Sequence, residues 1–198
     1  INYLSAARLF LFGARDVWFV VALPVYLASS LGWDNGYVGS FLALWIIAYG
    51  VVQTQAPRFT GKREGRVPDG KVAMGWALVL ALTPALIALA LHFDLHPAIS
   101  LVGGLMVFGA LIAINSSLHS YLIVSYAGAD GVSLDVGFYY MANALGRLLG
   151  TLLSGLVFQL HGLEACLWIS TLFILLAALI SLGLPRHQPP VSSSQGVS

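Results

Sequence analysis

The sequence contains very little charge for its length. Of its 198 residues, 9% are charged and 59% are hydrophobic, whereas a soluble domain carries about 25% charged residues. This scarcity argues against a soluble globular domain and predicts an integral membrane protein. The formal net charge of +1 says little, because in a membrane protein the position of each charge matters more than the total.

Cysteine and the motifs of common enzyme classes are equally scarce. Cys166 is the only cysteine, which excludes an internal disulfide, a thiolate metal cluster and a redox pair. We expect it to be apolar filling in the last helix. No GxxxxGK[ST], HExxH or GxSxG motif occurs, so we expect neither ATP hydrolysis nor another enzymatic activity, and no cofactor or metal. The chain opens at Ile1 without a signal-peptide pattern, which predicts a piece of a longer polypeptide.

Apolar segments long enough to cross a membrane occur six times. A helix needs about 20 residues to cross ~30 Å of hydrocarbon, and turn-forming sequences separate the segments. The predicted spans are residues 3–29, 37–55, 72–92, 98–121, 136–160 and 163–184. The sequence therefore predicts an all-α membrane protein with one six-helix transmembrane domain over residues 1–185. The Pro- and Ser-rich residues 186–198 are predicted to form a disordered cytoplasmic tail.

Lysine and arginine outside the spans gather on one side of the predicted membrane. Arg186 follows the last span, and five more cations lie in the second loop: Arg58, Lys62, Arg63, Arg66 and Lys71. Because such residues accumulate in cytoplasmic loops, we predict an inner (plasma) membrane protein with both ends of this segment in the cytoplasm. Binding of anionic lipid or nucleic acid is the weaker interpretation of the basic loop, since topology already explains it. We expect no nucleic-acid partner.

Ionisable side chains occur at a few positions inside the spans. An arginine at a helix centre costs roughly 2.5 to 3.5 kcal/mol, so it should face protein or a water-filled cavity. Arg8 has an alternative, since it lies near enough to the cytoplasmic end to extend to the interface. Asp16 directly follows Arg15 and points elsewhere on a helix, so we do not expect the two to pair. The other positions of this kind are His119 and Arg147.

The fifth span carries two rows of residues that recur every four positions. One row is polar and contains the arginine: Tyr139, Asn143, Arg147 and Thr151. The neighbouring row has only small side chains, which allow another helix to approach closely: Ala142, Gly146, Gly150 and Ser154. We therefore predict that Arg147 lies beside a packing seam, on an interior polar face.

The fourth span adds a further polar face. Asn115 and His119 lie on one face, whereas the serines beside them, Ser116, Ser117 and Ser120, are interpreted as helix-packing residues. His119 is either a proton carrier, because histidine titrates near neutral pH, or a hydrogen-bonded structural group.

Three helices thus present polar groups inward, with mainly positive fixed charge. Guanidinium groups hold phosphate-like oxygens bidentately, so we expect a small anionic substrate. The candidate substrate-binding residues are Arg15, Arg147, Asn143, Tyr139, Asn115, His119 and Arg8. The candidates for proton coupling are His119 and Asp16.

Six spans with a basic second loop resemble one half of a major facilitator superfamily transporter. The stretches GARDVWFVVALPVYL and DVGFYYMANALGR are more specific, and residues 1–187 look very much like the C-terminal half of the ArsJ-type organoarsenical efflux permeases. This resemblance implies a missing N-terminal six-helix half and export of 1-arseno-3-phosphoglycerate for arsenate resistance. It also implies a functional partner, the glyceraldehyde-3-phosphate dehydrogenase that makes the ester.

The residues agree with that substrate in one respect. Trivalent arsenic needs soft sulfur ligands, which one cysteine cannot supply as a cluster, whereas a multiply charged oxyanion suits arginine. Two alternatives stay open: a transporter of another phosphorylated or carboxylate anion, and a non-transporting scaffold fragment in the membrane lipid. A third alternative is the self-assembly of two such halves. If transport is coupled to an ion, we expect antiport against protons.

Overall fold

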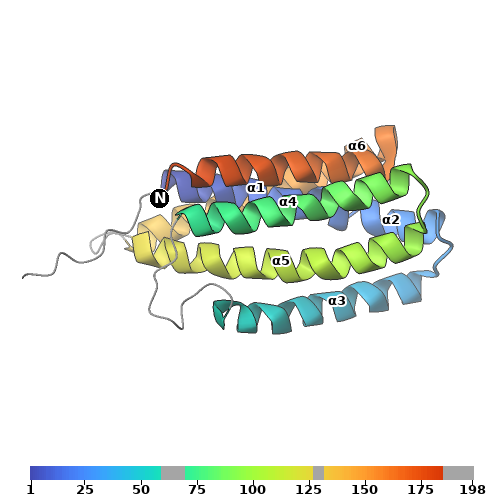
Figure 1. Cartoon of the computed structure of the whole chain (residues 1–198), viewed down its shortest axis with the longest axis horizontal. Coiled ribbons are helices and arrows are strands. Elements are labelled where there is room, and N and C mark those ends of the chain that lie inside the picture. The colour runs from blue at the N-terminus through green and yellow to red at the C-terminus, as the bar shows by residue number, and fades with distance from the viewer. Residues whose placement is uncertain (59–69, 127–131, 185–198) are drawn as a thin grey trace, which may run out of the picture.

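The computed structural model of the chain describes residues 1–58, 70–126 and 132–184. All regular secondary structure in these ranges is helical, and the helices lie side by side along one direction (Figure 1). The elements are α1 (Asn2–Phe19), α2 (Ala22–Ser29), α3 (Asn35–Gln55), the short 3₁₀ helix η1 (Ala56–Arg58), α4 (Gly70–His92), α5 (Pro97–Tyr126) and α6 (Val132–Ser181). The predicted all-α class is confirmed.

The predicted first span is two consecutive helices, because α1 ends at Phe19 and α2 begins at Ala22. Pro24 accounts for the break, since a proline has no N–H to donate and its ring clashes with the carbonyl four residues earlier. The backbone N–H of Ala22 donates instead to Ser154 Oγ, at 3.1 Å. Together α1 and α2 still form one apolar stretch long enough to cross a membrane.

Helix α6 contains the predicted fifth and sixth spans. The backbone at Gly162 has φ 78° and ψ −174°, a left-handed conformation that glycine adopts without steric cost. The chain reverses there, at the end of the bundle opposite the N-terminus (Figure 1). By length and hydropathy five continuous stretches of the described residues qualify as spans, and this reversal within the last one makes six crossings.

Two predicted boundaries were wrong. Helix α5 continues to Tyr126 rather than residue 121, and α6 begins at Val132 rather than residue 136. Inside the added turn of α5, the hydroxyl of Ser125 donates to the carbonyl of Tyr121 at 3.1 Å. A side chain that bonds within its own helix leaves the helix intact, which explains why the polar residues near this end do not begin the loop.

The reversal at Gly162 divides α6 into a first arm before this residue and a second arm after it. The first arm packs directly on the backbone of α1. A Cβ atom added to Gly150 would lie 2.6 Å from the Gly13 carbonyl oxygen, and one added to Gly146 would collide with the Leu9 carbonyl. Only glycine permits this approach, so the predicted small-residue seam is confirmed and its partner is α1. The second arm also contacts α1, where Phe173 packs edge-on against Phe10 at 5.5 Å between ring centroids.

The remaining helices complete the bundle around α1. Trp18 of α1 meets Phe108 of α5 edge-on, with ring centroids 5.1 Å apart. Helix α3 lies beside α5 (Figure 1), where Trp45 Nε1 donates to the Leu105 carbonyl at 2.9 Å. Cys166 is buried in the second arm of α6, in agreement with its predicted role as apolar filling.

Described residues that flank the three gaps lie at the same end of the bundle as the N-terminus (Figure 1). The 3₁₀ helix η1, which ends at Arg58, and the first turn of α4, which contains Lys71, lie toward this end. The connections at 30–34, 93–96 and 161–162 lie at the other end (Figure 1). This alternation is the one expected from six crossings. The cations Lys62, Arg63 and Arg66, and the predicted tail 186–198, lie outside the described residues.

Candidate functional site

Arg8 is buried at a point where three helices meet. Its side chain donates from Nε to Asn143 Oδ1 at 3.2 Å and from Nη1 to the carbonyl and the hydroxyl of Ser116, both at 3.3 Å. The rings of Phe12 and Tyr139 flank the guanidinium, with centroids 3.8 and 5.0 Å away. These contacts join α1 to α5 and to the first arm of α6. The alternative in which Arg8 extends to the interface is wrong, because its hydrogen bonds hold it inside, where the residue is only 5% exposed.

The charge of Arg8 has no acidic counterpart in the part of the chain that the structure describes. The ion pairs formed there involve other residues. A cation that is removed from water and left without a carboxylate is costly. An ionisable residue that is buried within a membrane-spanning helix therefore indicates a functional site.

A second cluster lies further along α1 and centres on Asp16, whose side chain is 1% exposed. Its Oδ1 accepts from Arg15 Nε at 2.6 Å and its Oδ2 accepts from Arg147 Nε at 3.0 Å. Our expectation that Arg15 and Asp16 do not pair was wrong. Successive residues diverge by about 100° around a helix, but the long arginine stem curves back to reach the carboxylate.

Arg147 presents its guanidinium at the surface of this chain. Its side chain is 55% exposed, against 15% for Arg15. Among the described residues, only its Nε atom makes a hydrogen bond, so both terminal nitrogens have free donors. The predicted position beside the seam is correct, but the head of the side chain is not interior to this chain. Because a guanidinium is costly against lipid, this surface must meet water or further protein.

Sequence reasoning missed two members of the site. Phe12 lies between the two clusters, since its ring centroid is 3.8 Å from Arg8 Cζ and 5.1 Å from Arg15 Cζ. Its spacing of four and three residues from the two arginines, which places all three on one face, was the available signal. Gln53 of α3 donates to Ser116 Oγ at 3.5 Å. Ser116, predicted to be only a packing residue, therefore accepts from both sides.

The polar residues of α5 do not all join the arginine clusters. Asn115 Nδ2 donates to the Trp76 carbonyl at 3.1 Å and to the Leu111 carbonyl at 2.9 Å. Asn115 is thus directed at α4 and holds α4 and α5 together. His119 is 1% exposed, and its Nδ1 atom has no hydrogen-bond partner among the described residues.

The charges on this side of α1 are unequal. Three arginines against one aspartate leave a formal charge of +2. Arg8 and Arg15 are seven residues apart, or about 10 Å along the axis. An excess of positive charge attracts anionic ligands, and guanidinium forks match carboxylate and phosphate oxygens. The arrangement therefore suits binding of a multiply charged oxyanion.

Comparison with known proteins identifies the family of the chain. The family model described as Major Facilitator Superfamily matches residues 4–197, which include both arginine clusters and all of the helices except the first two residues of α1. A search of curated proteins found no match.

Proposed function

The chain belongs to the Major Facilitator Superfamily, whose members are membrane transporters, and from this premise we propose that it is the C-terminal half of a secondary transporter for an oxyanion. The observation that carries the proposal is the formal charge of +2 on one side of α1. Transporters of this kind bind substrate near the middle of the bilayer, between their two halves. Arg15, Asp16 and Arg147 all lie near the middle of their spans.

We assign the contacts with the anion to the arginines in two roles. Arg147 has both terminal nitrogens free and faces outward from this half, as a group that binds substrate between two halves should. Arg8 is buried and already bonded, so it meets the anion only after the helices around it move apart. Asn143 and Tyr139 line the same approach beside Arg8.

The substrate that we propose is 1-arseno-3-phosphoglycerate, exported from the cytoplasm. The support comes from the resemblance of GARDVWFVVALPVYL and DVGFYYMANALGR to the ArsJ-type permeases, together with the excess of guanidinium groups. Both ends of this ester carry oxyanions, which bidentate arginine donors recognise. Another phosphorylated or carboxylate anion is the alternative substrate.

The remaining assignments combine this resemblance with the positions of the charged residues. We propose an inner-membrane location with both ends of this segment in the cytoplasm, an N-terminal six-helix half as structural partner, and the dehydrogenase as the source of the ester. Asp16 and His119 are the proposed proton carriers of an antiport cycle. Collapse of the proton gradient should then slow export, and an unchanged rate would exclude proton coupling.

The experiment that tests the proposal measures arsenic in cells that contain the dehydrogenase and are supplied with arsenate. Cells that also make this protein should retain less arsenic than cells that do not. Omitting the dehydrogenase is the control, because export of the ester should then stop. Equal retention combined with export of another organic anion would support the alternative substrate. No export of any anion would favour the scaffold alternative.

A further inference from the structure

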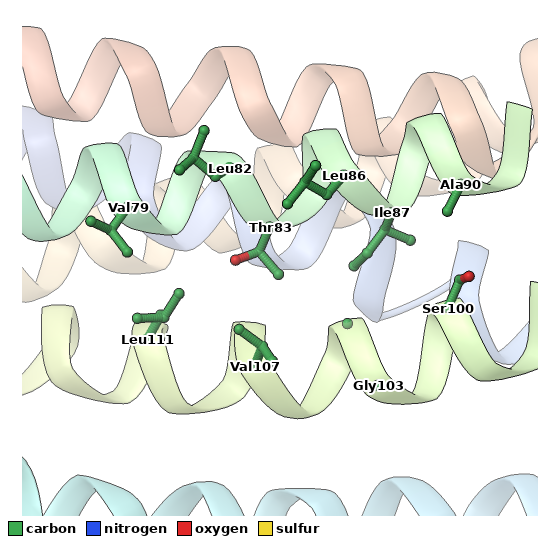
Figure 2. A pocket seen from close by; sticks show the side chains of 11 residues that line it. Val79, Leu82, Thr83, Leu86, Ile87, Ala90, Ser100, Gly103, Val107 and Leu111 are labelled. Atoms are coloured by element: carbon green, nitrogen blue, oxygen red, sulfur yellow. The ribbon is translucent and has the colours of Figure 1, made fainter. Parts of the chain in front are cut away.

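A groove runs between α4 and α5 on the apolar part of the bundle. Its volume is about 410 Å³. Figure 2 shows Val79, Thr83 and Ile87 pointing from α4 toward α5, with Val107 and Leu111 on the facing side. The lining is apolar apart from two hydroxyl groups, and that of Ser100 is already used in a 2.6 Å bond to the Leu95 carbonyl. The groove therefore offers shape and hydrocarbon contact rather than polar recognition.

Two adjacent glycines of α5 create this groove. Gly104 is pressed against the side chain of Ile87, which brings the two helices close together. Gly103 is turned about 100° away from it, and a Cβ atom added there would meet nothing within 4 Å. The helices are thus in contact along one line, and the missing side chain at Gly103 leaves open space beside that contact.

The length of the groove matches one leaflet of a bilayer. On α5 it extends from Ser100, next to the 93–96 connection, to Leu111, in the middle of the helix. At 1.5 Å per residue this is roughly 16 Å, about half of the ~30 Å hydrocarbon core. A transmembrane helix from another chain would need the full thickness, whereas a lipid chain anchored at the surface ends near the middle.

The groove is also narrow. A volume of about 410 Å³ spread over roughly 16 Å corresponds to a mean cross-section of roughly 25 Å². A single hydrocarbon chain, whose carbon atoms lie about 4 Å from the atoms they contact, suits this space better than a helix 10–12 Å in diameter. The rim is open to the surroundings, because Leu86 and Val107 are 62% and 54% exposed.

We propose that this groove binds one acyl chain of a phospholipid from the leaflet on the side of residues 93–96. Lipid tails are as apolar as leucine, so the preference comes from packing rather than from the hydrophobic effect. An acyl chain in the groove contacts protein atoms on several sides, and these contacts are lost when the groove is empty. Residues 93–100 contain no lysine or arginine, so the headgroup phosphate finds no permanent positive charge there and the lipid is selected by its acyl chain. This inference does not depend on the transported substrate.

The test uses phosphatidylcholine with a photoreactive diazirine on one acyl chain, mixed into phosphatidylcholine vesicles that contain the protein. After irradiation, mass spectrometry locates the modified residues. Adducts should concentrate on the groove, at least about fivefold above exposed apolar residues elsewhere on the bundle, such as Leu179. Gly103→Leu adds a side chain to the groove at a position where the Cβ atom meets nothing within 4 Å, and it should remove most of that excess.

Gly155→Leu is the matched control. Gly155 lies seven residues from Gly162, as Gly103 lies seven from His96, and a Cβ atom there also meets nothing within 4 Å; this variant should keep the labelling of the groove. Val107→Phe narrows the same groove and should repeat the effect of Gly103→Leu if that variant fails to fold. Even labelling over the whole surface, or an excess that persists in both narrowed variants, would overturn the proposal. A groove that takes no label at all would mean that polypeptide covers it, which would also overturn the proposal.

Discussion

The contact between α1 and the first arm of α6 allows a sharp comparison of two glycines. An alanine Cβ atom at Gly150 would lie 2.6 Å from the carbonyl oxygen and 3.0 Å from the Cα atom of Gly13. These are backbone atoms, so no rotamer change can relieve the collision and the two helices must separate. At Gly155, in the same arm, a Cβ atom meets nothing within 4 Å.

The two alanine variants are expected to change the stability of the protein differently. Alanine in place of glycine inside a helix contributes about 1 kcal/mol, so Gly155→Ala should raise stability by about that amount. Gly150→Ala gains the same contribution but suffers overpacking, which costs about 1–3 kcal/mol. The two variants should therefore differ by about 1–3 kcal/mol. For a chain of this size that corresponds to roughly 2–12 °C in unfolding temperature.

The assay follows thermal unfolding in detergent through the exposure of Cys166, the only cysteine of the chain and fully buried when folded. A dye that reacts with thiols reports the temperature at which this residue becomes accessible. Equal stabilisation by Gly150→Ala and Gly155→Ala would refute the reasoning. It would also weaken the evidence for the Asp16–Arg147 bond, which needs the same close approach of the two helices. The Cβ atom of Asp16 lies 3.1 Å from the position that an added Cβ atom would take at Gly150.

Two further variants test the polar contacts of α1 and α2. Arg8→Met should leave the unfolding temperature unchanged or raise it, because a buried charge without a carboxylate partner is itself costly, while anion export falls. A large loss of stability with normal export would make Arg8 a purely structural residue. Ser154→Ala removes the acceptor of the Ala22 N–H and should cost about 1–3 kcal/mol of unfolding free energy. Ser170→Ala is its control, since Ser170 is equally buried and its hydroxyl has no partner among the described residues; similar losses in both variants would contradict the role of Ser154 as the acceptor of the Ala22 N–H.

The features that the sequence predicted correctly depend on local periodicity. Apolar segments of sufficient length identify six crossings, and a glycine between two of them marks the turn at Gly162. The row of small residues at every fourth position identifies the packing face of the fifth span, because side chains at that spacing lie on one side of a helix. All of these can be read within one segment of the chain.

The features that were missed depend on contacts between segments or on side-chain flexibility. Periodicity marks Gly146 and Gly150 as a packing face, but it does not identify α1 as the partner. Helical geometry directs the Cβ atoms of Arg15 and Asp16 apart. It does not prevent the end of the long arginine side chain from reaching the neighbouring carboxylate. The direction of Asn115 likewise depends on the Trp76 carbonyl of another helix, to which no residue spacing in α5 points.

The most direct test of the central claim is the export rate of the proposed anion by Arg147 variants at equal membrane levels. Arg147→Leu removes the charge and the free donors and should lower export at least about tenfold, equivalent to about 1.4 kcal/mol. Arg147→Lys keeps the charge but not the bidentate fork, so its rate should be intermediate. Arg58→Leu, the same change at the end of the bundle, should export normally. Export by Arg147→Leu at the wild-type rate would contradict the account.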